Sequence, residues 1–142
     1  MLSKKECIVL SCLRKDARMS FVKLAGLVGI PVTTVYEVVR RLERKVVDRY
    51  TVDVDFEFIG FNVRMNFILR ANKKKDLLKF ILGSEYVNSV FKIDGNGFFV
   101  DALFLNFDKY NSFKEALEGF ELIFIREYPV IKGIKLEEAK VF

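Results

Sequence analysis

The sequence predicts an α+β fold in which an N-terminal winged helix-turn-helix is followed by a ferredoxin-like βαββαβ sandwich. A short basic helix follows the turn Gly29-Ile30-Pro31, an arrangement typical of a helix-turn-helix. Beyond residue 60 the apolar spacing changes from the helical period to a period of two. The later elements follow in the order strand, helix, strand, strand, helix, strand. We therefore expect two domains, residues 1–60, which end in a linker strand, and residues 61–142.

Two capped helices open the chain. Ser3 and Glu6 match the S-x-x-E pattern of a capping box, which predicts a helix over residues 4–15. After a polar turn at residues 15–18, Ser20 is expected to cap a second helix over residues 21–28. The expected inward-facing residues of both helices are Cys7, Val9, Leu10, Leu13, Leu24, Ala25 and Val28.

The third predicted helix separates apolar from polar side chains. Gly29 suits the end of the preceding helix and Pro31 the start of this one, which ends near Lys45. At 100° per residue, one side carries Val35, Val38, Val39 and Leu42, and the opposite side carries Thr33, Glu37, Arg40 and Arg44, with Arg41 at its flank. Such a helix fits the major groove of DNA, and its polar side suits phosphates and base edges.

A short hairpin is expected after this helix. Val46-Val47 and Tyr50-Thr51-Val52 flank Asp48-Arg49, a pattern that predicts the wing of a winged helix. Arg49 at its turn is a further candidate for DNA contact.

The candidate DNA-contacting residues leave some alternatives open. The full set is Ser20, Thr33, Thr34, Glu37, Arg40, Arg41, Arg44 and Arg49. Thr33 and Thr34 either contact DNA or cap their helix. Glu37 either reads a cytosine amino group or pairs with Arg41 four residues on, and the pair is favoured. The arginines alone would also suit a solvated face, but the turn before them favours DNA.

Positive charge is concentrated in the first third of the chain. Residues 1–50 contain 11 Lys and Arg against 5 Asp and Glu, whereas residues 51–142 contain 13 against 14. The excess of positive charge is therefore confined to residues 1–50. This asymmetry indicates a basic N-terminal segment, which suits nucleic acid as a partner, followed by a near-neutral remainder of the chain.

The second domain is expected to contain four strands and two helices. Phe61, Val63, Met65, Phe67 and Leu69 alternate with mostly polar residues, which predicts a strand. A helix follows from Lys73 to about Leu82, and strands near 87–93 and 98–107 are joined by the turn Asp94-Gly95-Asn96-Gly97. Ser112 and Glu115 form a second capping box, whose helix runs to about Arg126, and Pro129 stops it before a last strand at 131–136.

The strand at 98–107 is apolar on both faces. Phe99, Leu103, Leu105 and Phe107 share one parity, and Phe98, Val100, Ala102 and Phe104 share the other. One layer of helices covers only one face of a sheet, so a second copy of the sheet is expected to cover the other. We therefore expect a homodimer, with a tetramer or octamer also open.

The composition argues against several classes of protein. The chain has no histidine, which removes the most common general base and metal ligand. It has no Gly-rich phosphate loop and no H-E-x-x-H motif. Cys7 and Cys12 lie five apart in one predicted helix, which suits neither a disulfide framework nor a zinc site. We expect no enzymatic activity, no cofactor and no metal.

No part of the sequence predicts a membrane partner. No window approaches the roughly 18 consecutive apolar residues of a membrane span. The start of the chain lacks the apolar run of a signal peptide, which predicts a cytoplasmic location.

The head of the chain resembles the Lrp/AsnC (feast/famine) family of transcription regulators over roughly residues 2–60. The matching positions are Glu6, Val9, Leu10, Leu13, Asp16, Ala17, Arg18, Ser20, Leu24, Ala25, Val28, Gly29, Val35, Arg40, Leu42, Glu43, Arg44 and Tyr50. The second half is similar to the effector and oligomerisation (RAM) domain of that family in element order, Gly95 and Pro129. The resemblance implies an oligomer that binds pseudo-palindromic double-stranded DNA near promoters, associated with a prokaryotic nucleoid and modulated by small molecules, often amino acids.

Three positions depart from the family pattern. Val38 stands where the family usually has an arginine, and the glycine after the recognition helix is deleted between Lys45 and Val46. The effector turn of the family commonly reads Gly-x-x-Asp, which maps the acidic position onto Phe98. An aromatic ring cannot accept a hydrogen bond from an amino group as a carboxylate does. We therefore do not expect amino-acid sensing.

The candidate effector residues are Gly95, Asn96, Gly97 and Asp101. Either this site is empty and the protein is constitutive, which we favour, or Asp101 takes the carboxylate's role from a shifted position.

Two alternatives to a sequence-specific regulator remain. The first is an architectural DNA-binding protein of the same build. The second is an enzyme, since siroheme decarboxylases resemble this two-domain architecture, but histidine is expected to matter in those enzymes and is missing here.

Overall fold

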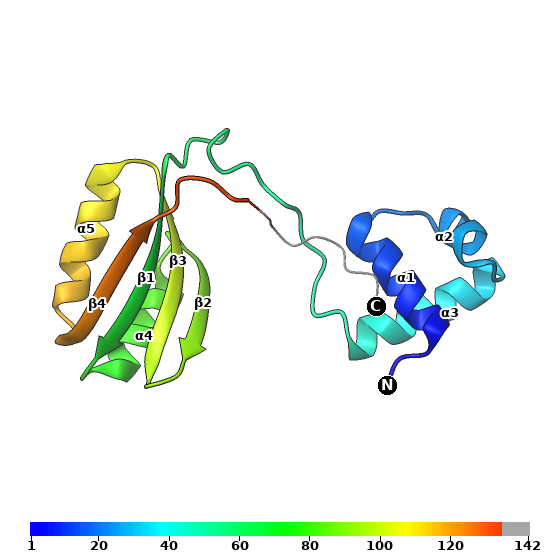
Figure 1. Ribbon diagram of the computed structural model, residues 1–142, viewed down its shortest axis with the longest axis horizontal. Coiled ribbons are helices and arrows are strands. Elements are labelled where there is room, and N and C mark those ends of the chain that lie inside the picture. Colours follow the sequence, from blue (N-terminus) through cyan, green and yellow to red (C-terminus); the bar gives the residue numbers. More distant parts are fainter. Residues whose placement is uncertain (135–142) are drawn as a thin grey trace. The chain divides into compact units, whose positions relative to one another are not determined.

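The N-terminal unit contains three helices, and capping side chains start the first two of them. In the computed structural model, which describes residues 1–134, these are α1 (Lys4–Lys15), α2 (Phe21–Val28) and α3 (Val32–Lys45) (Figure 1). The capping box of Ser3 and Glu6 is present, and the Ser20 side chain accepts a hydrogen bond from the Lys23 N–H. The three predicted helices are therefore confirmed, with the predicted bounds.

One hydrophobic cluster holds these helices together. Its buried members are Val9, Leu13, Leu24, Ile30, Val35, Val38, Val39 and Leu42. Four other residues predicted to face inward are only half-buried: Cys7, Leu10, Ala25 and Val28. Each helix contributes an apolar stripe too narrow to be stable alone, so the unit depends on all three packing together.

The predicted wing is wrong. Residues 46–53 contain no strand, and the side chains of Tyr50 and Val52 are exposed. An isolated two-stranded hairpin is marginally stable without a sheet to join. The Tyr50 hydroxyl instead donates to Glu43 Oε1 (3.1 Å), which ties this segment back to α3.

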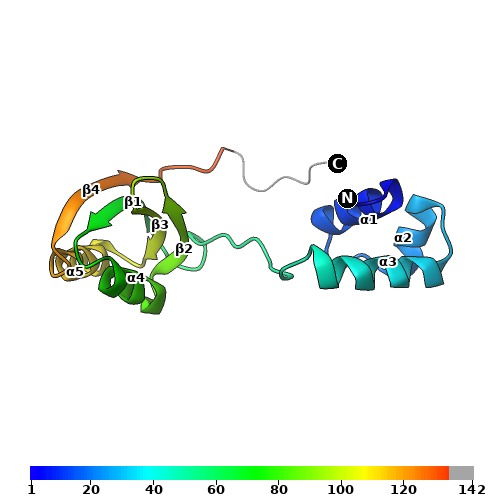
Figure 2. The same ribbon diagram turned by 90° about the horizontal axis from the view of Figure 1, so that it is seen from below.

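The C-terminal unit has the predicted βαββαβ order. Its elements are β1 (Val63–Ala71), α4 (Lys74–Gly83), β2 (Val87–Ile93), β3 (Gly97–Phe104), α5 (Phe107–Glu118) and β4 (Leu122–Pro129). The strands form one antiparallel sheet in the order β2-β3-β1-β4. Both helices lie on the same side of this sheet (Figure 2). The unit spans Val54–Gly133 and is separate from the unit of Met1–Asp53.

The last helix and the last strand lie earlier than predicted. Asn106 caps α5 by accepting the Lys109 N–H (3.0 Å), so Ser112 lies inside the helix and donates to the Asp108 carbonyl. The helix ends at Glu118, and residues predicted as its second half form β4 along β1. A short apolar run such as 122–125 suits either element, and pairing with β1 decides between them. Of the predicted strand 131–136, residues 131–134 form no strand, and residues 135 and 136 lie outside the described residues.

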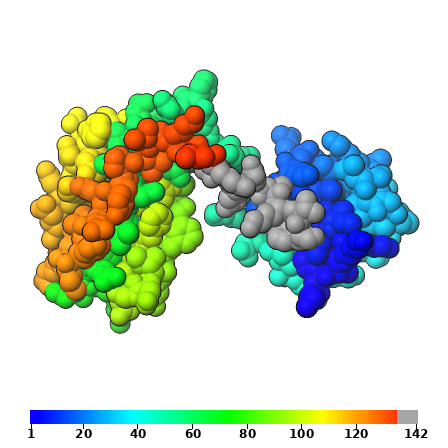
Figure 3. All heavy atoms as spheres, viewed as in Figure 1, coloured from blue at the N-terminus to red at the C-terminus, as the bar shows by residue number. Residues whose placement is uncertain are grey.

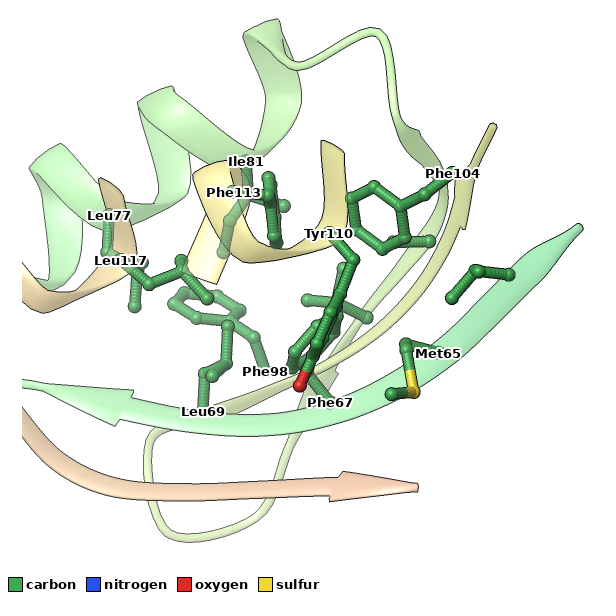
Figure 4. Close-up of a cluster of buried hydrophobic side chains, with 13 residues drawn as sticks. Met65, Phe67, Leu69, Leu77, Ile81, Phe98, Phe104, Tyr110, Phe113 and Leu117 are labelled. Atoms are coloured by element: carbon green, nitrogen blue, oxygen red, sulfur yellow. The ribbon is translucent and has the colours of Figure 1, made fainter. Parts of the chain in front are cut away.

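Strand β3 is shorter than predicted, and its face away from the helices carries Asp101 between Phe99 and Leu103. It ends at Phe104 because Asn106 starts α5, so Leu105 and Phe107 are exposed residues outside the strand. Phe98, Val100, Ala102 and Phe104 point to the helices, where they join the core of Figure 4 with Phe67, Tyr110 and Phe113. Phe104 and Phe113 lie 5.4 Å apart, a distance typical of packed aromatic pairs.

No single helix among residues 1–134 is long and apolar enough to cross a membrane. Only α2 and α3 taken together, across a bend of 102°, reach that length and composition.

Candidate nucleic-acid interface

The turn between α2 and α3 has helix-turn-helix geometry. Gly29 ends α2 with φ +69°, a left-handed conformation that glycine adopts without strain, and its N–H donates to the Ala25 carbonyl (2.9 Å). Ile30 is buried in the core and anchors the turn. The two helices meet at 102°, within the range of about 90–120° for this motif.

Helix α3 turns its apolar side inward and its charged side outward. Val35, Val38, Val39 and Leu42 are buried, so the valine at the family's usual arginine position contributes to the core. The side chains that line the outward face are Tyr36, Glu37, Arg40, Arg41, Glu43 and Arg44, which form an open groove. Of the predicted DNA-contacting residues, α3 thus brings four to one surface.

The N-terminus of α3 has no side-chain cap. Its N-cap residue is Pro31, and no side chain there accepts a helix N–H. Thr33 is exposed and Thr34 half-buried. Because neither threonine caps the helix, the alternative of DNA contact gains support for Thr33, and the first N–H groups of α3 suit a phosphate. Ser20, by contrast, is the cap of α2, although it is exposed.

Arg40 is held in place by an aromatic and an acidic neighbour. Its Nε donates to the Tyr36 hydroxyl (3.2 Å), and its Cζ lies 5.4 Å from the centre of that ring. Its Nη1 lies 3.5 Å from Glu43 Oε2. Burial and the hydrogen bond to Glu43 raise the pKa of Tyr50, which keeps that hydroxyl a donor. The candidate DNA-contacting residues predicted from sequence did not include Tyr36, Glu43 or Tyr50, although Tyr36 and Glu43 lie at helical spacing from Arg40.

Arg41 connects α3 to α1. Its Nη1 lies 3.1 Å from Glu6 Oε1, while the other oxygen of Glu6 accepts the Ser3 N–H (2.7 Å). The favoured pair between Glu37 and Arg41 is therefore wrong, because Glu6 from another helix takes the guanidinium. Glu37 is exposed and forms no ion pair within residues 1–134, so it remains available for DNA.

Arg44 and Arg49 are exposed cations. Arg44 Nε donates to the Arg40 carbonyl (3.2 Å), which directs the side chain along the outward face of α3. Arg49 lies in the segment without strands that follows the helix. Neither forms an ion pair within the described part of the chain.

The candidate effector residues do not form one site. Gly95 and Asn96 form the β2–β3 turn with φ values of +70° and +61°. Asp101 lies four residues beyond Gly97 along β3, about 13 Å at the usual rise of a strand. It is buried and accepts hydrogen bonds from Arg64 Nε (2.8 Å), Arg64 Nη2 (2.7 Å) and Asn88 Nδ2 (2.9 Å). With its carboxylate already paired, Asp101 is poorly placed to accept a ligand's amino group at the turn.

A pH-dependent contribution to stability is expected from Glu6. Hydrogen bonds from the N–H and hydroxyl of Ser3, with the nearby Arg41, hold the pKa of Glu6 below its usual value. A lowered folded pKa contributes stability above the unfolded pKa, about 4.3, and this contribution is lost as pH falls through the folded value. Glu6→Gln should therefore lower the Tm at pH 7, and the difference from wild type should shrink between about pH 5 and pH 3.

Thermal unfolding followed across this pH range measures the effect. Glu37→Gln is the matched control, because Glu37 lies on the exposed face of α3 without an ion pair in the described residues. A Tm difference for Glu6→Gln that stays constant with pH would contradict the role given to the Glu6 charge.

The family model for the AsnC-type helix-turn-helix domain matches residues 9–43. An uncharacterised HTH-type transcriptional regulator of Pyrococcus abyssi is 26% identical over 128 residues, which cover 85% of this chain and 87% of that relative. The HTH-type transcriptional regulator LrpA of the same organism is 33% identical over 64 residues, 44% of this chain and 45% of LrpA. Residues 9–43, which the family model matches, include the turn between α2 and α3 and most of α3.

Solved structures share the fold of this chain. A transcriptional regulator from Neisseria meningitidis, solved as a complex with L-Met, aligns with a TM-score of 0.89 at 18% identity, over 99% of this chain and 96% of that one. The AsnC structure from E. coli aligns with a TM-score of 0.83 at 15% identity, over 96% and 97%.

Proposed function

Because the chain belongs to the Lrp/AsnC family of helix-turn-helix transcriptional regulators, we propose that it binds specific pseudo-palindromic promoter sites as a homodimer or a larger even-numbered assembly. The observation that carries the proposal is the outward face of α3, where Arg40 and Arg44 lie exposed after an uncapped helix N-terminus. Arg44 supplies charge for the phosphate backbone, and Arg40 supplies a guanidinium for a guanine edge.

The Tyr36 contact supports a reading role for Arg40. A guanidinium held by a hydroxyl, a ring and a carboxylate loses less side-chain freedom when it meets a base. Phosphate contact needs no such fixed geometry, since it depends mainly on charge. This difference separates the proposed specific regulator from an architectural protein, which would bind all duplexes with similar affinity.

The uncovered face of the sheet supports self-association. The helices leave this face open, and it is the face of the sheet seen in Figure 3. Phe91 is 58% exposed there, and its ring lies 6.2 Å from that of Phe99, which Ile68 follows in register on β1. An aromatic patch of this kind suits a two-fold interface with a second copy of the same sheet. Such a dimer would read half-sites about 34 Å apart, one turn of DNA.

An amino-acid effector is not part of the proposal. The Neisseria regulator was solved with L-Met, but in this chain Phe98 is buried toward the helices and Asp101 is paired with Arg64. Among the described residues, no carboxylate is thus left beside Gly97 on β3 to accept an ammonium group.

A charged substitution on the sheet face that the helices leave open tests self-association. Phe91→Glu should convert the dimer to a monomer, because a carboxylate buried in an apolar interface is unfavourable. Sedimentation or light scattering at micromolar concentration measures the change. Leu82→Glu is the control, since Leu82 is 68% exposed on α4, in the layer that covers the other face. A monomeric wild type, or equal effects of both variants, would contradict the interface.

Phosphate binding by Arg44 is tested by its salt dependence. A selection from random oligonucleotides with the purified protein supplies the operator. Arg44→Ala should weaken binding to operator and bulk DNA alike, and should reduce the slope of log affinity against log salt by about 0.9 for each phosphate that is no longer neutralised. Lys109→Ala removes one exposed charge from α5 and serves as the control. An unchanged slope would contradict groove binding by α3.

The reading role of Arg40 is tested through Tyr36. Tyr36→Phe keeps the ring but removes the hydroxyl that accepts from Arg40 Nε. We expect operator affinity to fall by about 1 kcal/mol, the size of one hydrogen bond, with bulk-DNA affinity and salt slope unchanged. Competition binding with operator and random duplexes measures both quantities. Equal reductions on both duplexes would assign Tyr36 to phosphate binding or to folding instead.

A further inference from the structure

Glu43 on α3 uses both oxygens of its carboxylate in side-chain hydrogen bonds. Its Oε2 accepts from Arg40 Nη1 (3.5 Å), and its Oε1 accepts from the Tyr50 hydroxyl (3.1 Å). The Glu43 side chain is 31% exposed, against 60% for that of Arg40. The carboxylate is therefore fixed by two neighbours and lies next to a cation on the outward face of α3.

The segment after α3 brings Tyr50 to this carboxylate. The N–H groups of Val46 and Val47 both donate to the Leu42 carbonyl (2.8 and 2.9 Å), which holds the segment against the end of the helix. Val47 is half-buried and packs against the N-terminal core. The Tyr50 hydroxyl therefore reaches Glu43 from a backbone that is anchored just before it.

Arg40 and Arg44 differ in their charged neighbours, although both lie on the exposed face of α3. Arg40 has the carboxylate of Glu43 at 3.5 Å, whereas Arg44 forms no ion pair within residues 1–134. A neighbouring anion offsets part of the attraction between a cation and a phosphate, and the anion itself is repelled by a polyanion. Contact with phosphates is therefore favoured at Arg44 and disfavoured at Arg40.

Arg40 nevertheless keeps N–H groups for a base. Its Nε donates to Tyr36 and its Nη1 to Glu43, and within the described residues its Nη2 makes no hydrogen bond. A paired contact with O6 and N7 of guanine requires only two N–H groups. Because a base edge carries partial charges rather than a full negative charge, Glu43 repels it less than it repels a phosphate.

We propose that Glu43 is a specificity-determining residue, which disfavours phosphate contact by Arg40 and so reserves this guanidinium for a base edge. Tyr50 is the positioning residue that keeps the carboxylate beside Arg40. The carboxylate weakens binding to DNA of any sequence more than it weakens binding to the operator, which widens the difference between the two affinities. This inference rests on the proposed function and assigns a role to an acidic residue within its binding surface.

Competition binding of the full chain to the operator and to a random-sequence duplex, over a range of salt concentrations, tests the role of Glu43. Glu43→Gln keeps the size of the side chain and an oxygen that accepts from Tyr50, but removes the charge. Affinity for the random duplex should rise by about threefold, within the range of an exposed ion pair. The slope of log affinity against log salt on that duplex should steepen by about 0.9, the value for one more neutralised phosphate.

Operator affinity should not share this gain. Arg40 contacts a base there and loses one of the groups that orient it, so the ratio of operator affinity to random-duplex affinity should fall by about threefold or more. Tighter binding to the random duplex is also a change that partial unfolding would not produce. Circular dichroism confirms that each variant is folded.

Two further variants separate the position of the carboxylate from its charge. Tyr50→Phe removes the hydroxyl that holds Glu43 and keeps the charge, so it should shift affinity and slope in the same direction as Glu43→Gln, by a smaller factor. Glu118→Gln removes an equal charge from the exposed surface of α5. It should leave both affinities within about twofold, because charge at long range is screened.

Three results would overturn the proposal. Unchanged affinity and salt slope in Glu43→Gln, beside a wild type that discriminates, would contradict the role of Glu43 and leave the proposed function intact. An equal rise on operator and random duplexes would reduce Glu43 to a general repelling charge. A wild type that binds both duplexes with similar affinity would contradict the proposed function and, with it, this inference.

Discussion

Strand β3 directs large apolar side chains to both of its faces, and the organisation of the C-terminal unit depends on this constraint. One face supplies Phe98, Val100 and Phe104 to the core beneath α4 and α5. The other face directs Phe99 and Leu103 away from the helices, and Leu103 is buried even so. The sheet has one helical layer, on the side of Phe98, Val100 and Phe104, and the proposed homodimer would cover the other side. The polar groups of that face are paired with each other, as Asp101 with Arg64 and Asn88 shows.

Helix α3 likewise has one side that packs in the core and another side that is exposed. A stripe of four buried residues fixes the helix to α1 and α2, and the remaining faces are left for ligands. Arg41 belongs to the fixed part, because its ion pair with Glu6 joins α3 to the capping box of α1. Arg40 and Arg44 lie on the exposed face of α3, where we propose that DNA binds. Three arginines that look equivalent in the sequence thus have different partners in the structure.

The N-terminal and C-terminal units arrange their positively charged side chains differently. In the N-terminal unit, cations gather on one helix face, where a polyanion gains several contacts at once. In the C-terminal unit, the guanidinium carbons of Arg70 and Arg126 each lie 5.8 Å from the centre of the Phe124 ring. Residues 51–142 are near-neutral in total because acids elsewhere compensate for these two arginines.

Sequence alone determined the three N-terminal helices, the helix-turn-helix turn, the βαββαβ order and the two-faced strand, because caps, Gly29 and apolar periodicity act over a few residues. Tertiary structure decided what depends on distant partners. It removed the wing, which had no sheet to join, and moved β4 to residues 122–129, where β1 offers hydrogen bonds. It paired Arg41 with Glu6, Asp101 with Arg64, and Arg70 with the ring of Phe124. Each of these pairs joins residues far apart in the chain, and no local pattern specifies which side chains meet across such a separation.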